Sequence, residues 1–166
     1  MTDRLCFRVA SGQDVREISL LIRRVFTADI VRGWSSEALA SVHEENSGTS
    51  LLNALTSSSF QRVVIAGGNV SGYINFSKPH LLAILAVSSE LQGLGIGSRL
   101  ILDAIAEIDK AHPTVEVLQV NATERSMPFY AKRGFYPISP MLNVAGRRFI
   151  RMALWLRPRR MGWASD

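Results

Sequence analysis

The sequence has few of the residues that hold small secreted or metal-dependent domains together. It contains one cysteine, Cys6, and three histidines among 166 residues, and no Cys or His pairs have the spacing typical of a zinc site. Because a lone cysteine cannot form an internal disulfide, we expect a reducing compartment, with the cytoplasm as the default. We also expect no bound metal.

Long apolar runs are absent as well. The longest extends from Leu81 to Val87, whereas a membrane-spanning helix needs about 20 residues. The first eight residues carry charges on both sides of a short apolar patch, which is not the pattern of a signal peptide. We therefore predict no membrane association.

Acidic residues are outnumbered, with 14 Asp and Glu against 19 Lys and Arg, so the net charge is +5. This excess attracts anions such as nucleic acid or a phosphorylated small molecule, and charge alone does not choose among them. The length and the 47% hydrophobic content fit one domain, residues 1–166, with a short basic tail at about 157–166.

The apolar periodicity predicts both strands and helices. We expect strands at 5–10, 60–66, 70–76, 81–87, 115–120, 135–138 and 147–156, and helices at about 15–28, 38–45, 51–55, 96–111 and 124–132. Gly67, Gly68 and Asn69 predict a hairpin turn, which excludes a purely parallel sheet. The nearly continuous apolar character of 81–87 indicates a central strand covered on both faces. This order predicts an α/β or α+β domain with a mixed sheet and helices on its faces.

The most informative segment is a glycine loop that joins a strand to a helix. Its sequence is Gln92-Gly93-Leu94-Gly95-Ile96-Gly97-Ser98. Three glycines leave the backbone open, so several amides can converge on an anion at the positive end of the helix. The same pattern is compatible with a tight structural turn. It lacks the Gly-Lys-Ser/Thr of a P-loop, and it follows a late strand rather than the first unit of a dinucleotide-binding fold.

This loop resembles the acyl-CoA-binding motif Gln/Arg-x-x-Gly-x-Gly/Ala of the GNAT superfamily of N-acetyltransferases. The segment Phe129-Tyr130-Ala131-Lys132-Arg133-Gly134-Phe135 is similar to a second motif of that family. The resemblance covers about residues 4–156 and is closest to uncharacterised bacterial members. It implies a GNAT-like fold with a mixed, mostly antiparallel sheet of about seven strands and helices on both faces. It also implies an acetyl-CoA-dependent enzyme.

The resemblance assigns the donor site to three segments. It implies pantetheine binding and carbonyl polarisation by backbone amides of a bulged strand at Leu85, Ala86 and Val87, and pyrophosphate binding by the loop from Gln92 to Ser98. It implies further contacts from Asn121, Ser126, Phe129 and Tyr130. Family members often have Asn at the position of Thr123, so the hydrogen bond that such an Asn makes to the pantetheine arm is not carried over.

The resemblance implies direct transfer of the acetyl group to an amine, a reaction in which Cys6 takes no part, and two residues are candidate catalysts for it. Tyr130 would be the general acid, because a phenol with an ordinary pKa near 10 suits a leaving thiolate. The alternative is an aromatic core residue. His80 is the first candidate base, because imidazole titrates near neutral pH, and a surface histidine is the alternative. Asp29, Glu90 and Glu116 are weaker candidates, and a chain of waters would need no base.

The acceptor and the partners are less well defined by the sequence. Trp34 and Phe76 could line an amine pocket or serve as a helix-cap and a core residue. The basic residues near the C-terminus are either a solvated face or a surface for an acidic partner; they are Arg147, Arg148, Arg151, Arg157, Arg159 and Arg160. The apolar strand at 149–156 could pair with a second copy to form a homodimer, or it could be covered within one chain.

We therefore predict transfer of an acetyl group from acetyl-CoA to a primary amine of a small molecule or a protein. One alternative is acetylation of aminoacyl-tRNA, which the basic charge permits. Another is a non-catalytic acyl-CoA sensor. A plain nucleic-acid-binding domain is disfavoured, because no helix-turn-helix, zinc finger or RNP-type segment is present.

Overall fold

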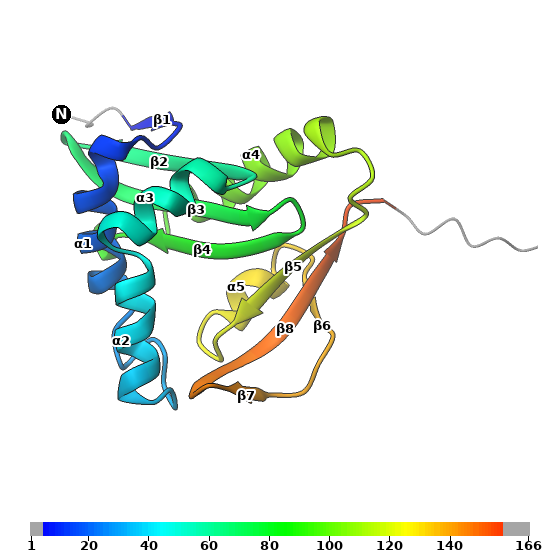
Figure 1. Ribbon diagram of the computed structural model, residues 1–166. Coiled ribbons are helices and arrows are strands. Elements are labelled where there is room, and N and C mark those ends of the chain that lie inside the picture. The colour runs from blue at the N-terminus through cyan, green and yellow to red at the C-terminus, as the bar shows by residue number, and fades with distance from the viewer. Residues whose placement is uncertain (1–4, 158–166) are drawn as a thin grey trace, which may run out of the picture.

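In the computed structural model, which describes residues 5–157, one sheet carries helices on both of its faces (Figure 1). The strands are β1 (Cys6–Arg8), β2 (Phe60–Ala66), β3 (Asn69–Lys78), β4 (Leu81–Val87), β5 (Val117–Ala122), β6 (Tyr136–Pro137), β7 (Leu142–Val144) and β8 (Arg147–Trp155). The main helices are α1 (Val15–Val25), α2 (Ser36–Glu45), α3 (Gly48–Ser57), α4 (Ile96–Ala111) and α5 (Met127–Ala131). The short 3-10 helices η1 (Gly12–Asp14) and η2 (Ser89–Leu91) precede α1 and the glycine loop.

The strand order is β1-β2-β3-β4-β5-β8-β6, with β7 paired to β8. Every pair is antiparallel except β4 with β5, which is parallel. The expected mixed, mostly antiparallel sheet is therefore confirmed, with eight strands where we expected about seven. The additional strand is β7, whose three residues are too few for an alternating pattern to be recognised from the sequence.

Two apolar clusters, one on each face of the sheet, form the core. The first joins α1 and α3 to the side chains of Val63 and Tyr73. The second joins α4 and α5 to Val64 and Ile74, the neighbours of those residues along the strands. Because successive side chains of a strand point to opposite faces, this alternation places α1 and α3 on one face and α4 and α5 on the other.

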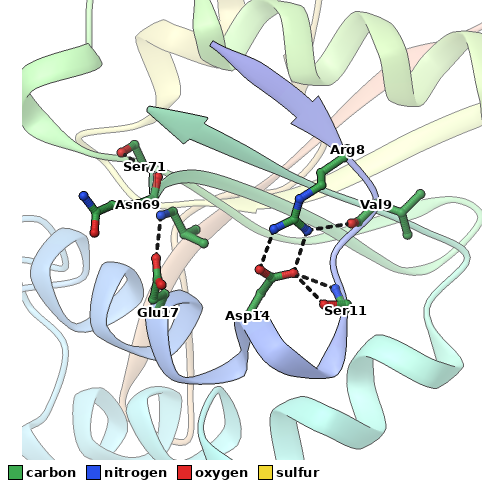
Figure 2. Close-up of polar contacts among 8 residues, drawn as sticks. Arg8, Val9, Ser11, Asp14, Glu17, Asn69 and Ser71 are labelled. Atoms are coloured by element: carbon green, nitrogen blue, oxygen red, sulfur yellow. Dashed lines mark hydrogen bonds and ion pairs between the residues drawn. The ribbon is translucent and has the colours of Figure 1, made fainter. Parts of the chain in front are cut away.

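Local polar contacts hold the start of α1 against the sheet (Figure 2). Asp14 accepts two hydrogen bonds from the Arg8 guanidinium, at 2.7 and 2.8 Å, and one from the Ser11 amide at 2.8 Å. The hydrogen bonds from Arg8 and Ser11 lower the pKa of Asp14 to about 2. Farther along the helix, Glu17 accepts a hydrogen bond from the amide of Val70 at 2.7 Å. The turn predicted at 11–14 thus begins the helix and also ties it to β1.

The parallel pair of β4 and β5 produces the feature that positions the site. The two strands pair only at Leu81 with Gln119 and at Leu82 with Val120. Beyond these residues they diverge, as Figure 1 shows. The prediction of a central strand at 81–87 with helices on both faces is confirmed, because β4 lies between β3 and β5, with Ala86 in the α1 cluster and Leu82 in the α4 cluster. The cover is incomplete, since only Leu82 and Ala86 are buried, and every residue of β4 except Ala86 lines the opening between the two strands.

The last long strand, β8, lies inside the sheet. It pairs with β5 from Ala122 and Ile150 to Val117 and Trp155 on one side, and with β6 and β7 on the other. Of the two alternatives for this strand, the structure supports cover within one chain, so β8 is not an edge for pairing with a second copy. Arg159 and Arg160 lie outside the described residues.

Candidate functional site

A cavity of about 820 Å³ opens where β4 and β5 diverge. Its lining comes from both faces of the sheet. One group of residues belongs to the glycine loop, the first turn of α4, the end of β5 and α5. The other belongs to the segment from the end of α1 to α2, to α3 and to the start of β8. The cavity therefore connects the two faces of the molecule.

The glycine loop presents free backbone donors to this cavity. The first backbone hydrogen bond of α4 joins the Arg99 amide to the Gly95 carbonyl at 3.0 Å. The amides of Ile96, Gly97 and Ser98 therefore have no acceptor within the helix. Gln92 fixes the loop to the end of β4, because its side-chain amide donates to the Val87 carbonyl at 2.9 Å.

Glycine is needed at the three positions of the loop for different structural reasons. Gly93 and Gly95 adopt φ values of +78° and +80°, and nothing lies within 4 Å of the position of a Cβ on either residue. They provide left-handed turns beside open space. A Cβ on Gly97 would lie 3.0 Å from the ring of Phe129. Gly97 is thus required for close packing of α4 against α5, and only the first two glycines leave room for an approaching anion.

Arg133 adds a positive charge at the N-terminus of α4. Its Nε donates to the Ser98 hydroxyl at 2.9 Å, a second guanidinium nitrogen also donates to that hydroxyl, and the guanidinium lies 3.4 Å from the centre of the Phe129 ring. Burial lowers the pKa of Arg133 below its ordinary value. A cation at the positive end of a helix is unfavourable without a counter-ion, so this arrangement fits an anion bound between Arg133 and the loop.

Sequence reasoning missed Arg133, although it lies within the Phe129–Phe135 segment. A signal was present, because an arginine occurs one turn after an aromatic pair in a chain that already has a predicted anion loop. Its position against Ser98, 35 residues away in the sequence, depends on how α4 packs on α5. The packing of these two helices is a tertiary property that local spacing does not supply.

The open edge of β4 provides further donors. The Ser88 amide bonds to the Ser71 carbonyl at 2.8 Å, and Ala86 is paired with Tyr73 and Leu85 with Ile74. Hydrogen-bonded and non-bonded pairs alternate in an antiparallel ladder. The backbone groups of Leu85 and Val87 therefore face away from β3 into the opening, whereas those of Ala86 face β3.

The structure thus modifies the prediction for the bulged strand. Ala86 is fully buried and does not line the cavity, so its amide is not available there. The β3–β4 ladder has two irregularities, at Ala83 of β4 and at Ser77 of β3. The bulge in β4 therefore precedes the predicted stretch of Leu85 to Val87.

Tyr130 lies on the wall of the cavity, between the rings of Phe129 and Phe135. Tyr130 is 6% exposed, and burial raises the pKa of its phenol above the ordinary value. Among residues 5–157, its hydroxyl has no hydrogen-bond partner. The phenol is therefore neutral at pH 7, carries a proton and is free to donate it to a group bound in the cavity.

A local hydrogen-bond network begins α5 and so positions Tyr130. The Ser126 amide donates to the Thr123 hydroxyl at 3.2 Å, and the two side-chain hydroxyls lie 3.0 Å apart. Thr123 is buried at 8% exposure. The position where relatives often have Asn is thus used here to form the turn from β5 into α5.

The other predicted site residues fall into two groups. The cavity is lined by Leu85, Val87, Gln92, Gly93, Gly95, Ile96, Gly97, Asn121, Ser126, Phe129 and Tyr130. It is not lined by His80, Ala86, Leu94 or Ser98, although Ser98 contacts Arg133. Leu94 is 67% exposed.

His80 and the weaker base candidates are not brought to the cavity. His80 is exposed in the turn before β4, and only its backbone carbonyl is engaged, by the Gln119 amide at 2.7 Å. Asp29 and Glu90 line a smaller adjoining pocket of about 310 Å³, which shares Val25, Ile30, Gln92 and Arg125 with the cavity, and Glu116 is exposed. The structure gives no support for a catalytic role of His80.

Of the two residues proposed to line an amine pocket, Trp34 and Phe76, only Trp34 lines the cavity. Its indole Nε1 donates to the Arg148 carbonyl at 2.7 Å. Phe76 is fully buried in the core cluster that contains α4. On this side Glu45 and Arg147 line the cavity and form an ion pair. Sequence reasoning missed Glu45, and it assigned Arg147 to a solvated face or an acidic-partner surface and not to the cavity.

Residues 5–157 contain neither a candidate metal site nor a candidate membrane-spanning helix. In this part of the chain, no three His, Cys, Asp or Glu side chains gather closely enough to hold a metal ion. No helix there is both long enough and apolar enough to cross a membrane.

Comparison with known families and structures gives one consistent result. Residues 30–156 match the model of the acetyltransferase (GNAT) domain. A PaiA N-acetyltransferase from Thermoplasma acidophilum, solved in complex with coenzyme A, is 21% identical with a TM-score of 0.72, and the match covers 92% of this chain and 99% of that one. No curated protein matches the chain.

Two further structures have similar folds. A GNAT family acetyltransferase from Brucella melitensis, in complex with acetyl-CoA, is 19% identical with a TM-score of 0.65, covering 94% of this chain and 90% of that one. The ribosomal-protein-S18-alanine N-acetyltransferase from Escherichia coli is 18% identical with a TM-score of 0.62, covering 96% and 98%. The family resemblance predicted from the glycine loop and the Phe129–Phe135 segment is confirmed.

Proposed function

The chain belongs to the GNAT family of acetyltransferases, and on that premise we propose that it transfers an acetyl group directly from acetyl-CoA to a primary amine. One observation carries this proposal. A single cavity joins an anion site at the start of α4, the free backbone edge of β4 and the hydroxyl-bearing side chain of Tyr130. Direct transfer needs an anchored donor, a polarised thioester carbonyl and a proton for the leaving thiolate, and these three features supply them.

The donor fits the residues present. The free amides of Ile96, Gly97 and Ser98 and the guanidinium of Arg133 bind the pyrophosphate. Acetyl-CoA supplies the activated acyl group as a thioester. The amides of Leu85 and Val87 face the opening between β4 and β5, where they bind the pantetheine arm and polarise the thioester carbonyl.

Tyr130 acts as the general acid. Burial raises the pKa of its phenol, which keeps the proton on the oxygen until the thiolate leaves. Its ring is held between Phe129 and Phe135, with ring centres 5.1 and 5.5 Å away, so the hydroxyl has a fixed direction. A positioned general acid contributes about 10²–10⁴-fold to the rate.

Water takes the proton from the acceptor amine. Glu45 is the one carboxylate among the described residues that line the cavity, and it is paired with Arg147. His80 is exposed and does not line the cavity. We therefore expect the variant His80→Ala to keep the parental kcat/KM and pH profile, and a loss of the acidic limb of the profile would restore His80 as the base.

The test of the proposal is titration calorimetry with acetyl-CoA and with CoA, followed by an assay of thiol release with primary amines. Micromolar binding together with amine-dependent thiol release supports the proposal. Binding without thiol release from any amine would point to an acyl-CoA sensor. Absence of binding would mean that the glycine loop is a structural turn, and the proposal would fail.

A further inference from the structure

We infer that the acceptor is a small primary amine with an apolar body, held between α2 and the β7–β8 hairpin, and not a polypeptide or a polyamine. The inference rests on the proposed function and adds the class of acceptor. It is carried by the contacts that join two segments on opposite sides of the cavity. One segment is 34–45, which includes α2, and the other is 145–149, at the start of β8.

Three sets of contacts connect these segments. The Ser35 amide donates to the Gly146 carbonyl at 2.9 Å, and the Trp34 indole donates to the Arg148 carbonyl at 2.7 Å. The Arg147 guanidinium pairs with Glu45 and donates to the Ser41 hydroxyl at 3.2 Å. Figure 1 shows α2 and the start of β8 approaching each other below the opening between β4 and β5.

We call these contacts between segments 34–45 and 145–149 the bridge. The bridge leaves no room for a polypeptide chain between the two segments. Gly146 has a φ of +77°, and a Cβ on it would collide with the Ser35 side chain. The turn of the hairpin therefore packs directly on the N-terminus of α2. An extended peptide lying between the two segments would have to break these hydrogen bonds, whereas a small molecule inside the cavity leaves them in place.

The lining next to the bridge is mostly apolar. It contains the side chains of Phe26, Ile30, Trp34 and Phe149, with Ala54 from α3. Pockets with apolar walls and few polar groups bind ligands chiefly by burying apolar surface. The neutral amine that attacks the thioester is consistent with this environment, because it needs no counter-ion.

The charges in the cavity disfavour an acceptor with several ammonium groups. The described residues that line it include three arginines, Arg125, Arg133 and Arg147, and one carboxylate, Glu45. The Glu45 carboxylate forms an ion pair with Arg147 and also accepts a hydrogen bond from the Ser41 hydroxyl at 2.9 Å. A second ammonium group would have to compete with Arg147 for Glu45, and the positive charges of the three arginines would repel it.

The experiment compares three acceptors at saturating acetyl-CoA by thiol release. The probes are 2-phenylethylamine, spermidine and an unstructured seven-residue peptide with a free N-terminus and one lysine. We expect kcat/KM for 2-phenylethylamine to exceed that of the other two at least tenfold. Faster turnover of spermidine or of the peptide, or turnover of none of the three, overturns the inference.

A pair of α3 variants tests where the amine binds. Ala54 lines the cavity, whereas Thr56 on the same helix is exposed and does not. Ala54→Leu fills part of the apolar lining and should raise KM for 2-phenylethylamine about tenfold while leaving the affinity for acetyl-CoA unchanged. Thr56→Leu, the matched control, should change neither. Equal KM values for the two variants would place the amine elsewhere and overturn the inference.

Two direct binding measurements separate failure of this inference from failure of the proposed function. Calorimetry with acetyl-CoA alone reports the donor site. Quenching of tryptophan fluorescence by 2-phenylethylamine, compared between the parent and Trp34→Phe, reports the amine site without turnover. Acetyl-CoA binding without quenching from Trp34 overturns only the inference about the acceptor, whereas quenching without acetyl-CoA binding overturns the proposed function.

Discussion

Arg133 offers the sharpest test of the donor site, because its effects on stability and on binding should differ. Its guanidinium bonds to the Ser98 hydroxyl at the N-terminus of α4 and lies over the ring of Phe129. Burial lowers the pKa of Arg133, so the folded chain without ligand holds the cation at some cost. An anionic pyrophosphate at this position would offset that cost and accept hydrogen bonds from the same group.

The perturbation is Arg133→Met, which keeps an apolar chain over Phe129 and removes the charge. A hydrogen bond to a charged group contributes about 1.5–3 kcal/mol, which corresponds to a loss of about 10- to 150-fold in affinity for acetyl-CoA. The free energy of unfolding of the ligand-free protein should change by less than about 1 kcal/mol, because the loss of the hydrogen bonds and the removal of a partly buried charge act in opposite directions.

The assay is calorimetry with acetyl-CoA and, separately, with S-acetylpantetheine, which has no pyrophosphate. Arg133→Met should weaken only the first, and the loss should shrink at high salt. Lys132→Met is the matched control, because Lys132 is exposed and does not line the cavity. An unchanged dissociation constant for acetyl-CoA, or equal losses for both ligands, would refute the assignment of Arg133 to the pyrophosphate.

Three other predictions concern catalysis, the loop and stability. Tyr130→Phe should lower kcat about 100-fold with the acetyl-CoA dissociation constant unchanged in calorimetry, and an undiminished kcat would remove Tyr130 from the acid role. Gly95→Ala should cost about 1 kcal/mol of stability and weaken acetyl-CoA binding. Gly68→Ala is the matched control, because Gly68 has nearly the same φ in a hairpin turn with open space; it should cost the same stability and leave acetyl-CoA binding intact. Equal acetyl-CoA affinity of the two variants would contradict the assignment of the glycine loop to the pyrophosphate. The pKa of Asp14 falls from 3.8 to about 2 on folding, so its carboxylate stabilises the fold above about pH 4 and loses this effect as the pH falls toward 2. Asp14→Asn should therefore cost about 2 kcal/mol at pH 7 and almost nothing at pH 2 in urea unfolding, and a pH-independent cost would show that the ion pair with Arg8 is not the cause.

Much of the fold could be predicted because its signals are local. The capping turn before α1, the glycine hairpin between β2 and β3 and the glycine loop before α4 each depend on a few adjacent residues. Strands β2 and β4 have the predicted limits, 60–66 and 81–87. Helix α1 ends at Val25, three residues before the expected end, because helix ends depend on packing as well as on periodicity.

The apolar stretch of β4 shows why a correct strand gave no sign of the cavity beside it. Seven apolar residues in a row favour a central strand with helices on both faces, which β4 is, and the same pattern suits a strand that also lines a cavity. The difference depends on β5, which pairs with β4 only at its beginning. No feature within 81–87 carries that information, since the divergence is a property of the pair.

His80 and Arg133 show what residue type and spacing leave out. His80 was chosen by its chemistry and its position before a central strand, whereas the fold exposes it in the turn. Arg133 was overlooked, because its place beside Ser98 depends on how α5 packs against another helix. A glycine loop can be recognised because its residues are adjacent in the sequence, whereas side chains that come together from separate elements cannot.

The two halves of the site differ in the same way. The donor half is built mainly from one loop and one short helix, so a family motif covers it. The acceptor half is built by contacts such as that between the Trp34 indole and the Arg148 carbonyl, 114 residues apart, and by the ion pair of Glu45 with Arg147. Two chains could share the glycine loop and Tyr130 and still differ completely in these contacts. The acceptor must therefore be inferred from the folded cavity, and the bridge between α2 and β8 is the feature that limits its size.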